Sequence, residues 1–118
     1  MSDPSSPVYQ ELYTSTFSKN YKRYGSLRKK IHTLIDEILA RPFSATEYLD
    51  YKDGKDLRGL RSARIDRNFR IIFCVWEEYQ KKTGKTIPLL SQSMQEKLQK
   101  NSIVFITVGP HEKSYRLQ

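Results

Sequence analysis

The chain has 118 residues, which suits one domain with a single modest hydrophobic core. Lys and Arg number 21 against 13 Asp and Glu, so the net charge is +8 and the isoelectric point is near 9.6. This excess favours a polyanionic partner, such as RNA, DNA, an anionic membrane or an acidic protein, unless the charge serves solubility alone. The single cysteine excludes an internal disulfide, and no apolar run is long enough to cross a bilayer.

The N-terminus and the cysteine both indicate a cytoplasmic protein without a membrane segment. Residues 1–8 lack the basic and apolar regions of a signal peptide and are expected to be disordered. Cys74 lies inside an apolar segment, where we expect a small buried side chain in a reducing compartment.

The first half of the chain predicts a strand followed by a long helix. Residues 11–17 alternate as a β-strand does, and apolar residues then recur at three- and four-residue spacing from Phe17 to Leu39. Ser18 is the expected N-cap, and Gly25-Ser26 either kinks the helix or divides it. Arg41 should end it, because the residue before a proline is disfavoured in helical geometry.

The centre of the chain predicts a hairpin and a buried strand. Residues 43–56 form a charged, tyrosine-rich loop, either irregular or with one helical turn. A hairpin begins at Leu57 and turns at residues 66–68, since Asp and Asn tolerate tight turns. Residues 69–76 and 103–108 are apolar on both faces, which is typical of internal strands covered on both sides.

Two later segments are harder to assign. The connection over residues 77–102 is too long for a plain hairpin, and it is either a partner-binding feature or a flexible excursion. Within it we expect an exposed loop at 80–85 and a short helix at 94–100. After the last strand, Gly109-Pro110 predicts a sharp turn that leaves His111 and Tyr115 near the strand's end.

Arginine occurs at every third position through the hairpin, and these positions are the main functional signal. Strand side chains alternate between faces, so this spacing sends three of the arginines to one face and two to the other. The first set is Arg58, Arg64 and Arg70, and the second is Arg61 and Arg67. The planar guanidinium suits phosphate oxygens. The alternative is surface ion pairs with Asp50, Asp53, Asp56 or Asp66.

These residue types can support RNA cleavage without a metal. Such a reaction needs a base for the 2′-hydroxyl, an acid for the leaving 5′-oxygen and cations for the phosphorane. Candidate phosphate clamps are Arg61, Arg64 and Arg70, and Lys52 and Lys55 are candidates for flanking phosphates. His111 suits proton transfer, and Tyr115 suits proton transfer or stacking on a base. No metal-ligand cluster or phosphate-binding glycine loop is found, so we expect no cofactor.

The order of these elements resembles the RelE/ParE superfamily of type II toxins. The likeness is strongest over Leu57–Val75, which is similar to that family's central hairpin. It recurs over Ile106–Tyr115, which is similar to the tail of its RNase branch, and Leu34–Pro42 resembles the end of its long helix. The resemblance covers most of residues 11–115, and we expect a single domain over 9–118 with an insert at about 77–102.

The resemblance implies an α+β fold, a small twisted and mostly antiparallel sheet with N-terminal helices on one face. It implies a ribosome-dependent mRNA endoribonuclease, silenced by a cognate antitoxin protein. By this resemblance Arg64 and Arg70 supply charge, while His111 and Tyr115 form the catalytic tail. From their charge alone we expect Arg58, Arg61, Arg67, Lys52 and Lys55 to bind RNA or its phosphates.

Some questions stay open at this point. The general base is Glu112 or a lysine, and the connection at 77–102 is longer than is usual in the family. The alternatives in function are a ParE-like toxin that targets DNA gyrase without nuclease chemistry, and an inactive basic RNA-binding member.

Overall fold

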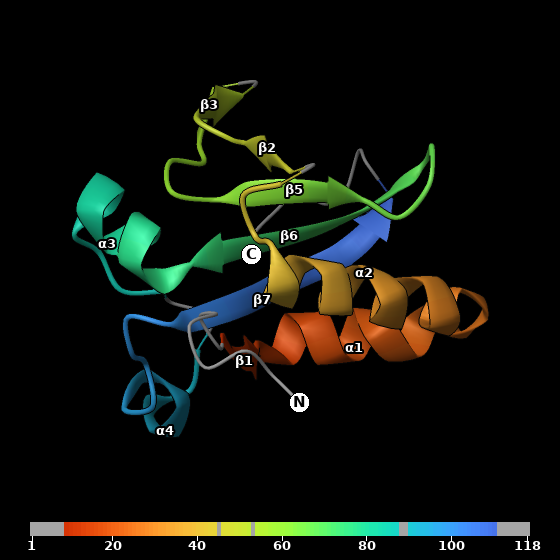
Figure 1. The fold of residues 1–118 in the computed structure, drawn as a ribbon, viewed down its shortest axis with the longest axis horizontal. Coiled ribbons are helices and arrows are strands. Elements are labelled where there is room, and N and C mark those ends of the chain that lie inside the picture. The colour runs from red at the N-terminus through yellow and green to blue at the C-terminus, as the bar shows by residue number, and fades with distance from the viewer. Residues whose placement is uncertain (1–8, 45, 53, 88–89, 111–118) are drawn as a thin grey trace.

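A five-stranded mixed sheet with helices forms the molecule, as the α+β expectation requires (Figure 1). The computed structural model describes residues 9–44, 46–52, 54–87 and 90–110. The strands are β1 (Gln10–Tyr13), β2 (Glu47–Tyr48), β3 (Tyr51–Lys52), β4 (Lys55–Asp56), β5 (Arg61–Arg64), β6 (Phe69–Val75) and β7 (Ser102–Pro110). The helices are α1 (Ser15–Arg23), α2 (Arg28–Ala40), α3 (Trp76–Thr83) and α4 (Gln92–Gln95).

The sheet order is β1-β7-β6-β5-β2, with β1 parallel to β7 and the other pairs antiparallel. The central strands β6 and β7 are buried over most of their length, which confirms the expectation from their two apolar faces. Their register shifts between Ile72 and Phe73, which pair with Thr107 and Phe105. Ile106 is therefore an extra residue in β7, a bulge of the kind that increases local twist.

One face of the sheet, called here the helical face, packs against α1 and α2. Its core holds Phe17 of α1, Ile31, Ile35 and Ile38 of α2, and sheet residues that include Phe73 and Phe105. The apolar residues that recur along the predicted long helix are thus the residues it buries. A short 3-10 turn at Gly25–Leu27 divides the helix into α1 and α2, one of the two outcomes expected there. The helix ends at Ala40 with Arg41 as its C-cap, as Pro42 predicts.

The first strand is shorter than predicted, and the helix begins earlier. β1 ends at Tyr13, and the N-cap is Thr14 rather than Ser18. The buried Thr14 hydroxyl donates to the Ile106 carbonyl at 2.6 Å and accepts from the Phe17 amide at 3.0 Å. This contact with a residue 92 positions away fixes the helix start, and a local pattern could not show it.

The segment between β6 and β7 covers part of the other face of the sheet, called here the opposite face. Ile87 and Leu90 of this segment are buried with Ile72 and Cys74, while Trp76, Tyr79, Met94 and Leu98 pack against the cluster. Residues 80–83, expected in an exposed loop, belong to α3, which ends at Gly84 in the left-handed conformation. The short helix covers Gln92–Gln95 instead of 94–100, because Ser91 caps it.

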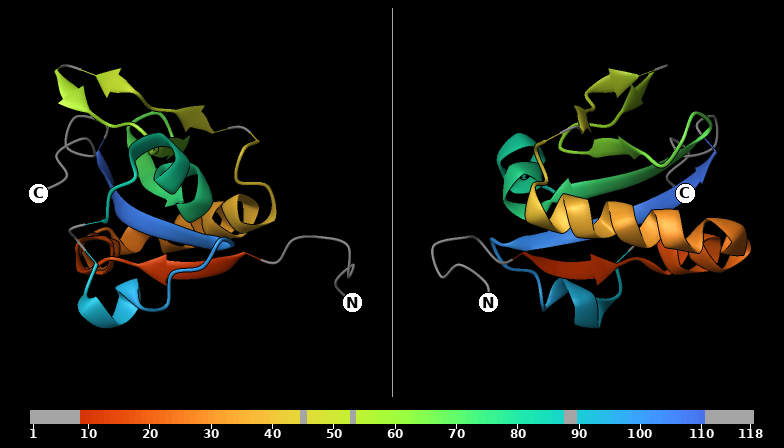
Figure 2. Two further views of the ribbon diagram at one scale, coloured as in Figure 1. Left: turned by 90° about the vertical axis from the view of Figure 1, so that its left-hand side faces the viewer. Right: turned by 45° about the vertical axis from the view of Figure 1, so that its right-hand side comes forward.

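The loop at 43–56 contains strands that the sequence did not predict. β2 pairs with β5, while β3 and β4 form a separate small hairpin (Figure 2). The predicted turn at 66–68 is confirmed, since the Asp66 carboxylate accepts from the Asn68 and Phe69 amides. The predicted sharp turn at Gly109-Pro110 is wrong, because both residues continue β7 opposite Arg70 and Phe69. The disorder expected for residues 1–8 concerns a segment outside the described residues.

Candidate functional site

The arginine pair at the end of the β5–β6 hairpin is the best-defined polar feature of the opposite face. Arg64 and Arg70 are directly paired across the two strands, so their Cβ atoms share a face. Arg70 is two positions before Ile72 of the opposite-face core and therefore shares its face, whereas Ile71 belongs to the helical face. The shared parity of Arg64 and Arg70 is thereby confirmed.

Arg70 is held by side chains from β5 and β2, the next two strands of the sheet. Its side chain is only 9% exposed, and Nη1 donates to the Ser62 hydroxyl at 3.3 Å. The same nitrogen lies 3.5 Å from Oε2 of Glu47, whose side chain is 57% exposed. Such contacts orient the guanidinium at the surface of the sheet while an accessible carboxylate stays beside it.

Glu47 is a site residue that sequence reasoning missed. It reaches Arg70 because β2 pairs with β5 in a register that sets Glu47 opposite Ser62. In the sequence, Glu47 is one of several charged residues in a segment interpreted as a loop. The signal that could have found it is the pairing of β2, which depends on a strand only two residues long.

Arg64 lies at the edge of the sheet and is exposed. With Lys29, Lys30 and Glu37 of α2 it borders a hollow of about 360 Å³. The side chains around this hollow carry three positive charges and one negative charge. Arg64, whose Cβ shares a face with Arg70, thus also borders α2, the helix of the helical face.

Arg61 belongs to a different environment from Arg64 and Arg70. Its guanidinium makes two contacts with the Glu78 carboxylate of α3, at 2.9 and 3.0 Å, and a third with the Thr46 hydroxyl at 3.3 Å. The rings of Phe43 and Tyr48 lie against the same guanidinium. The structure does not bring this arginine together with the Arg64–Arg70 pair, and its charge is compensated within the protein.

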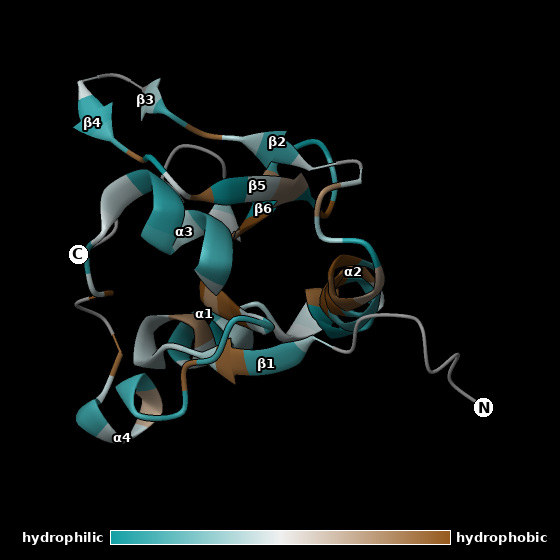
Figure 3. Ribbon diagram, turned by 60° about the vertical axis from the view of Figure 1, so that its left-hand side comes forward, coloured by the Kyte–Doolittle hydropathy of each residue, from teal (hydrophilic) through white to brown (hydrophobic). Residues whose placement is uncertain are grey.

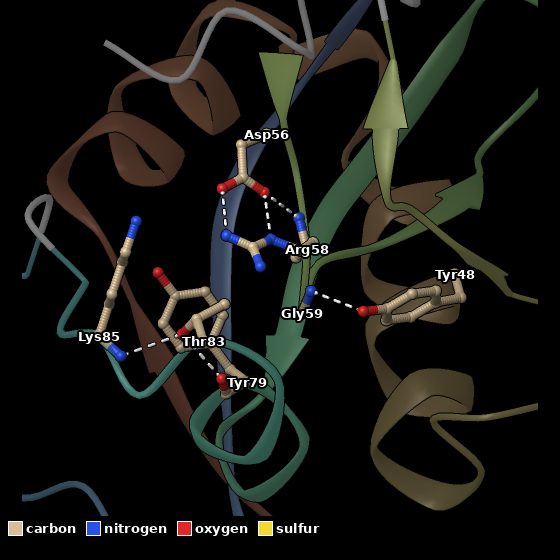
Figure 4. A network of polar contacts seen from close by, with 7 residues as sticks. All are labelled: Tyr48, Asp56, Arg58, Gly59, Tyr79, Thr83 and Lys85. Carbon is tan, nitrogen blue, oxygen red and sulfur yellow. Dashed lines mark hydrogen bonds and ion pairs between the residues drawn. The ribbon is translucent and has the colours of Figure 1, made fainter.

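Arg58 forms an ion pair on the surface, as the alternative interpretation of the arginines allows (Figure 4). Its Nε and Nη2 atoms donate to the two carboxylate oxygens of Asp56 at 2.9 and 2.8 Å. These hydrogen bonds, together with one from the Arg58 amide, lower the pKa of Asp56 to about 2.

The remaining predicted RNA-binding residues are separate from this pair. Arg67 is exposed in the β5–β6 turn, and Lys55 is exposed on β4. Lys52 lies on β3, and only its backbone is described. His111 and Tyr115, and with them Glu112, lie outside the described residues, which end at Pro110 beside Phe69.

Nothing in the described part of the chain gathers three or more His, Cys, Asp or Glu side chains in a metal-binding arrangement. Over the same residues, no helix has the length and apolar character needed to cross a membrane.

Comparison with known proteins shows the fold. No family model and no curated protein matches the sequence. Among solved structures, a chain of the RelBE2 toxin–antitoxin complex of Mycobacterium tuberculosis matches with a TM-score of 0.55 and 13% identity, covering 87% of this chain and 98% of that one. YafQ of Escherichia coli matches with a TM-score of 0.54 and 16% identity, covering 91% and 98%.

The DinJ–YafQ toxin–antitoxin complex of E. coli gives a third match, with a TM-score of 0.55 and 14% identity, covering 92% of this chain and 98% of that one. Identities this low carry no residue roles from one protein to another. The structural matches do establish the architecture over nearly the whole length of each neighbour. The chain therefore has a RelE-like toxin fold.

Proposed function

We propose that this protein is the toxin of a type II toxin–antitoxin system and cleaves mRNA on the ribosome without a metal ion. The observation that carries the proposal is Arg70, a nearly buried arginine oriented on the opposite face with a carboxylate beside it. The RelE-like fold supports the same conclusion, because the structural neighbours include chains of toxin–antitoxin complexes. The partners are then mRNA on the ribosome and a cognate antitoxin, in the cytoplasm.

The cleavage proceeds by attack of the ribose 2′-oxygen on the adjacent phosphorus. The O2′–P bond forms and the P–O5′ bond breaks, giving a 2′,3′-cyclic phosphate and a 5′-hydroxyl. Arg70 and Arg64 stabilise the additional negative charge on the phosphorane. His111 protonates the departing 5′-oxygen, and Tyr115 supports it.

The base that accepts the 2′-hydroxyl proton is Glu47 in this proposal. Its carboxylate is accessible and lies 3.5 Å from Arg70 Nη1, so a phosphate bound by Arg70 would place the neighbouring ribose close to it. Glu112, which lies outside the described residues, and the lysines remain the alternative bases considered from the sequence.

Primer extension on a defined transcript tests the activity. Inducible expression in a bacterial host should produce new translation-dependent cuts, and Arg70→Ala/His111→Ala should abolish them. Arg23→Ala is the matched control, since it removes one exposed positive charge from α1 and leaves the site intact. Growth arrest without cuts would favour the gyrase-targeting alternative, and absence of both would favour the inactive RNA-binding alternative.

The role of Glu47 is tested separately by Glu47→Gln. This substitution keeps the size of the side chain and removes its basicity, so cleavage should slow by roughly 10²- to 10⁴-fold. RNA binding should not weaken, because one negative charge is lost next to Arg70. Unchanged cleavage by this variant would return the base to Glu112 or a lysine.

A further inference from the structure

The hairpin of β3 and β4 presents an aromatic ring to solvent. Tyr51 is 63% exposed and is, with Phe43, one of two large hydrophobic side chains exposed in the described part of the chain. The Arg61 guanidinium lies over the Phe43 ring and also contacts the ring of Tyr48 on β2. The Tyr51 ring is on a hairpin that pairs with no other strand of the sheet. The ring in this position is therefore accessible to a ligand.

One side of the Tyr51 ring is backed by Arg58. The guanidinium carbon lies 5.4 Å from the ring centroid, within the range of a cation–π contact. Asp56 fixes this guanidinium through both carboxylate oxygens and also accepts a hydrogen bond from the Arg58 amide (Figure 4). Ring and cation are therefore held together before any ligand arrives, which lowers the entropy cost of binding.

The base of the hairpin is anchored on the same face as Arg70. Leu49, Leu57 and Leu60 flank the hairpin in sequence and are buried in one cluster with Ile72, whose side chain shares a face with Arg70. The hairpin projects from one end of the molecule, beyond β2 and β5 (Figure 2). The hairpin is thus joined to the face that carries the proposed cleavage site.

The surroundings of Tyr51 favour a planar, polar ligand over an apolar protein surface. The described neighbours in the hairpin are Gly54, Lys55 and Asp56, Arg58 follows it, and β4 is hydrophilic (Figure 3). A hot spot for a protein partner normally lies within a ring of further contacts that exclude water. A single ring backed by a cation and surrounded by charges is instead typical of surfaces on which unpaired bases stack.

We propose that Tyr51, backed by Arg58, is a stacking subsite for an unpaired nucleobase of the RNA substrate. This inference rests on the proposed RNA-cleaving function. It adds a contact with a base to the phosphate contacts proposed for Arg64 and Arg70. Arg58 then acts as a positioning residue beneath the ring, because its charge is already paired with Asp56.

The test compares RNA with and without bases. Two single-stranded oligonucleotides of equal length are used, a 2′-O-methyl RNA, which cannot be cleaved by 2′-oxygen attack, and an abasic ribose-phosphate chain. Binding is measured by fluorescence anisotropy at low salt. Tyr51→Ala should weaken binding of the base-bearing chain by roughly 10- to 100-fold and leave binding of the abasic chain unchanged.

Two further variants distinguish stacking by the aromatic ring from the effect of side-chain size alone. Tyr51→Phe keeps the ring and should bind like the wild type, whereas Tyr51→Leu should bind like Tyr51→Ala. Equal losses on both oligonucleotides, or no loss, would overturn the stacking subsite, as would a loss confined to binding of an antitoxin. The proposed function is tested independently by primer extension. Cleavage by the wild type can be observed even if the stacking subsite fails its test. Absence of cleavage by the wild type would overturn the cleavage proposal itself.

Discussion

Gly59 illustrates how a single backbone position links β5 to α3. Its φ is +82°, and a Cβ added there would lie 2.6 Å from Tyr79 Cδ2 and 3.0 Å from the Tyr79 Cα. The Gly59 amide also donates to the Tyr48 hydroxyl at 3.0 Å (Figure 4). We expect Gly59→Ala to lower the free energy of unfolding by about 2–4 kcal/mol, from the left-handed backbone and the clash together.

Urea denaturation measures this effect, and Gly84→Ala provides the comparison. Gly84 also has a positive φ, of 64°, but no atom lies within 4 Å of an added Cβ. Its substitution should cost only the backbone contribution, about 1–2 kcal/mol. Equal losses at the two glycines would show that the approach of Tyr79 contributes nothing.

Cys74 should make stability depend on alkaline pH. Burial in the apolar core raises the pKa of its thiol well above the ordinary value of 9.0. The folded thiol therefore stays neutral while the thiol of the unfolded chain ionises, so its stabilising contribution is complete below pH 9 and declines above it.

Comparison with Cys74→Ala isolates that contribution. The difference in unfolding free energy between wild type and variant should be constant from pH 6 to 8, and then shrink by about 1 kcal/mol between pH 9 and 10. A difference that stays constant up to pH 10 would contradict a buried, neutral thiol.

At the scale of elements, the Arg61–Glu78 pair connects α3 to β5 and β2. The side chains are 13% and 18% exposed, and Thr46, Phe43 and Tyr48 complete the environment of the guanidinium. Removing one partner leaves a poorly solvated charge, so Arg61→Ala should cost about 2 kcal/mol of unfolding free energy.

A double-mutant cycle with Glu78→Ala should show strong coupling, since the second substitution removes the charge that the first leaves unpaired. The Arg58–Asp56 pair is the control, because it is more exposed and should show weaker coupling. Coupling of equal size in the two pairs would mean that burial does not strengthen the contact between Arg61 and Glu78.

At the scale of the whole molecule, one sheet carries a hydrophobic core on each face. Ile71 and Ile72 are neighbours in β6, yet the first belongs to the helical-face core and the second to the opposite-face core. Loss of β6–β7 pairing would disrupt both cores, so we expect them to unfold together.

Two probes test this expectation. Trp76, the single tryptophan, packs against the opposite-face core and reports on it by fluorescence, while α1 and α2 dominate the far-ultraviolet circular dichroism. The two urea transitions should coincide. A tryptophan transition at lower urea would show that the segment between β6 and β7 detaches before the sheet unfolds.

Local chemistry and periodicity determined much of this structure. Pro42 ends the long helix, Asp66 makes the hairpin turn, and alternation along two strands puts Arg64 and Arg70 on one face. The two apolar faces of residues 69–76 also predicted that other elements pack on both sides of this strand, but they did not show which elements these are. Each of these features depends on residues a few positions apart, so a single sequence contains the information.

Only the tertiary structure decided the contacts between distant segments. Thr14 caps α1 because Ile106 accepts its hydroxyl, Arg61 is paired because α3 brings Glu78 to it, and Glu47 reaches Arg70 because β2 joins the sheet. Ile87 and Leu90, in the segment between β6 and β7, are buried because Ile72 and Cys74 of the sheet form an apolar surface against which they pack. These arrangements depend on register and packing between strands and helices, which the local pattern of one segment does not contain.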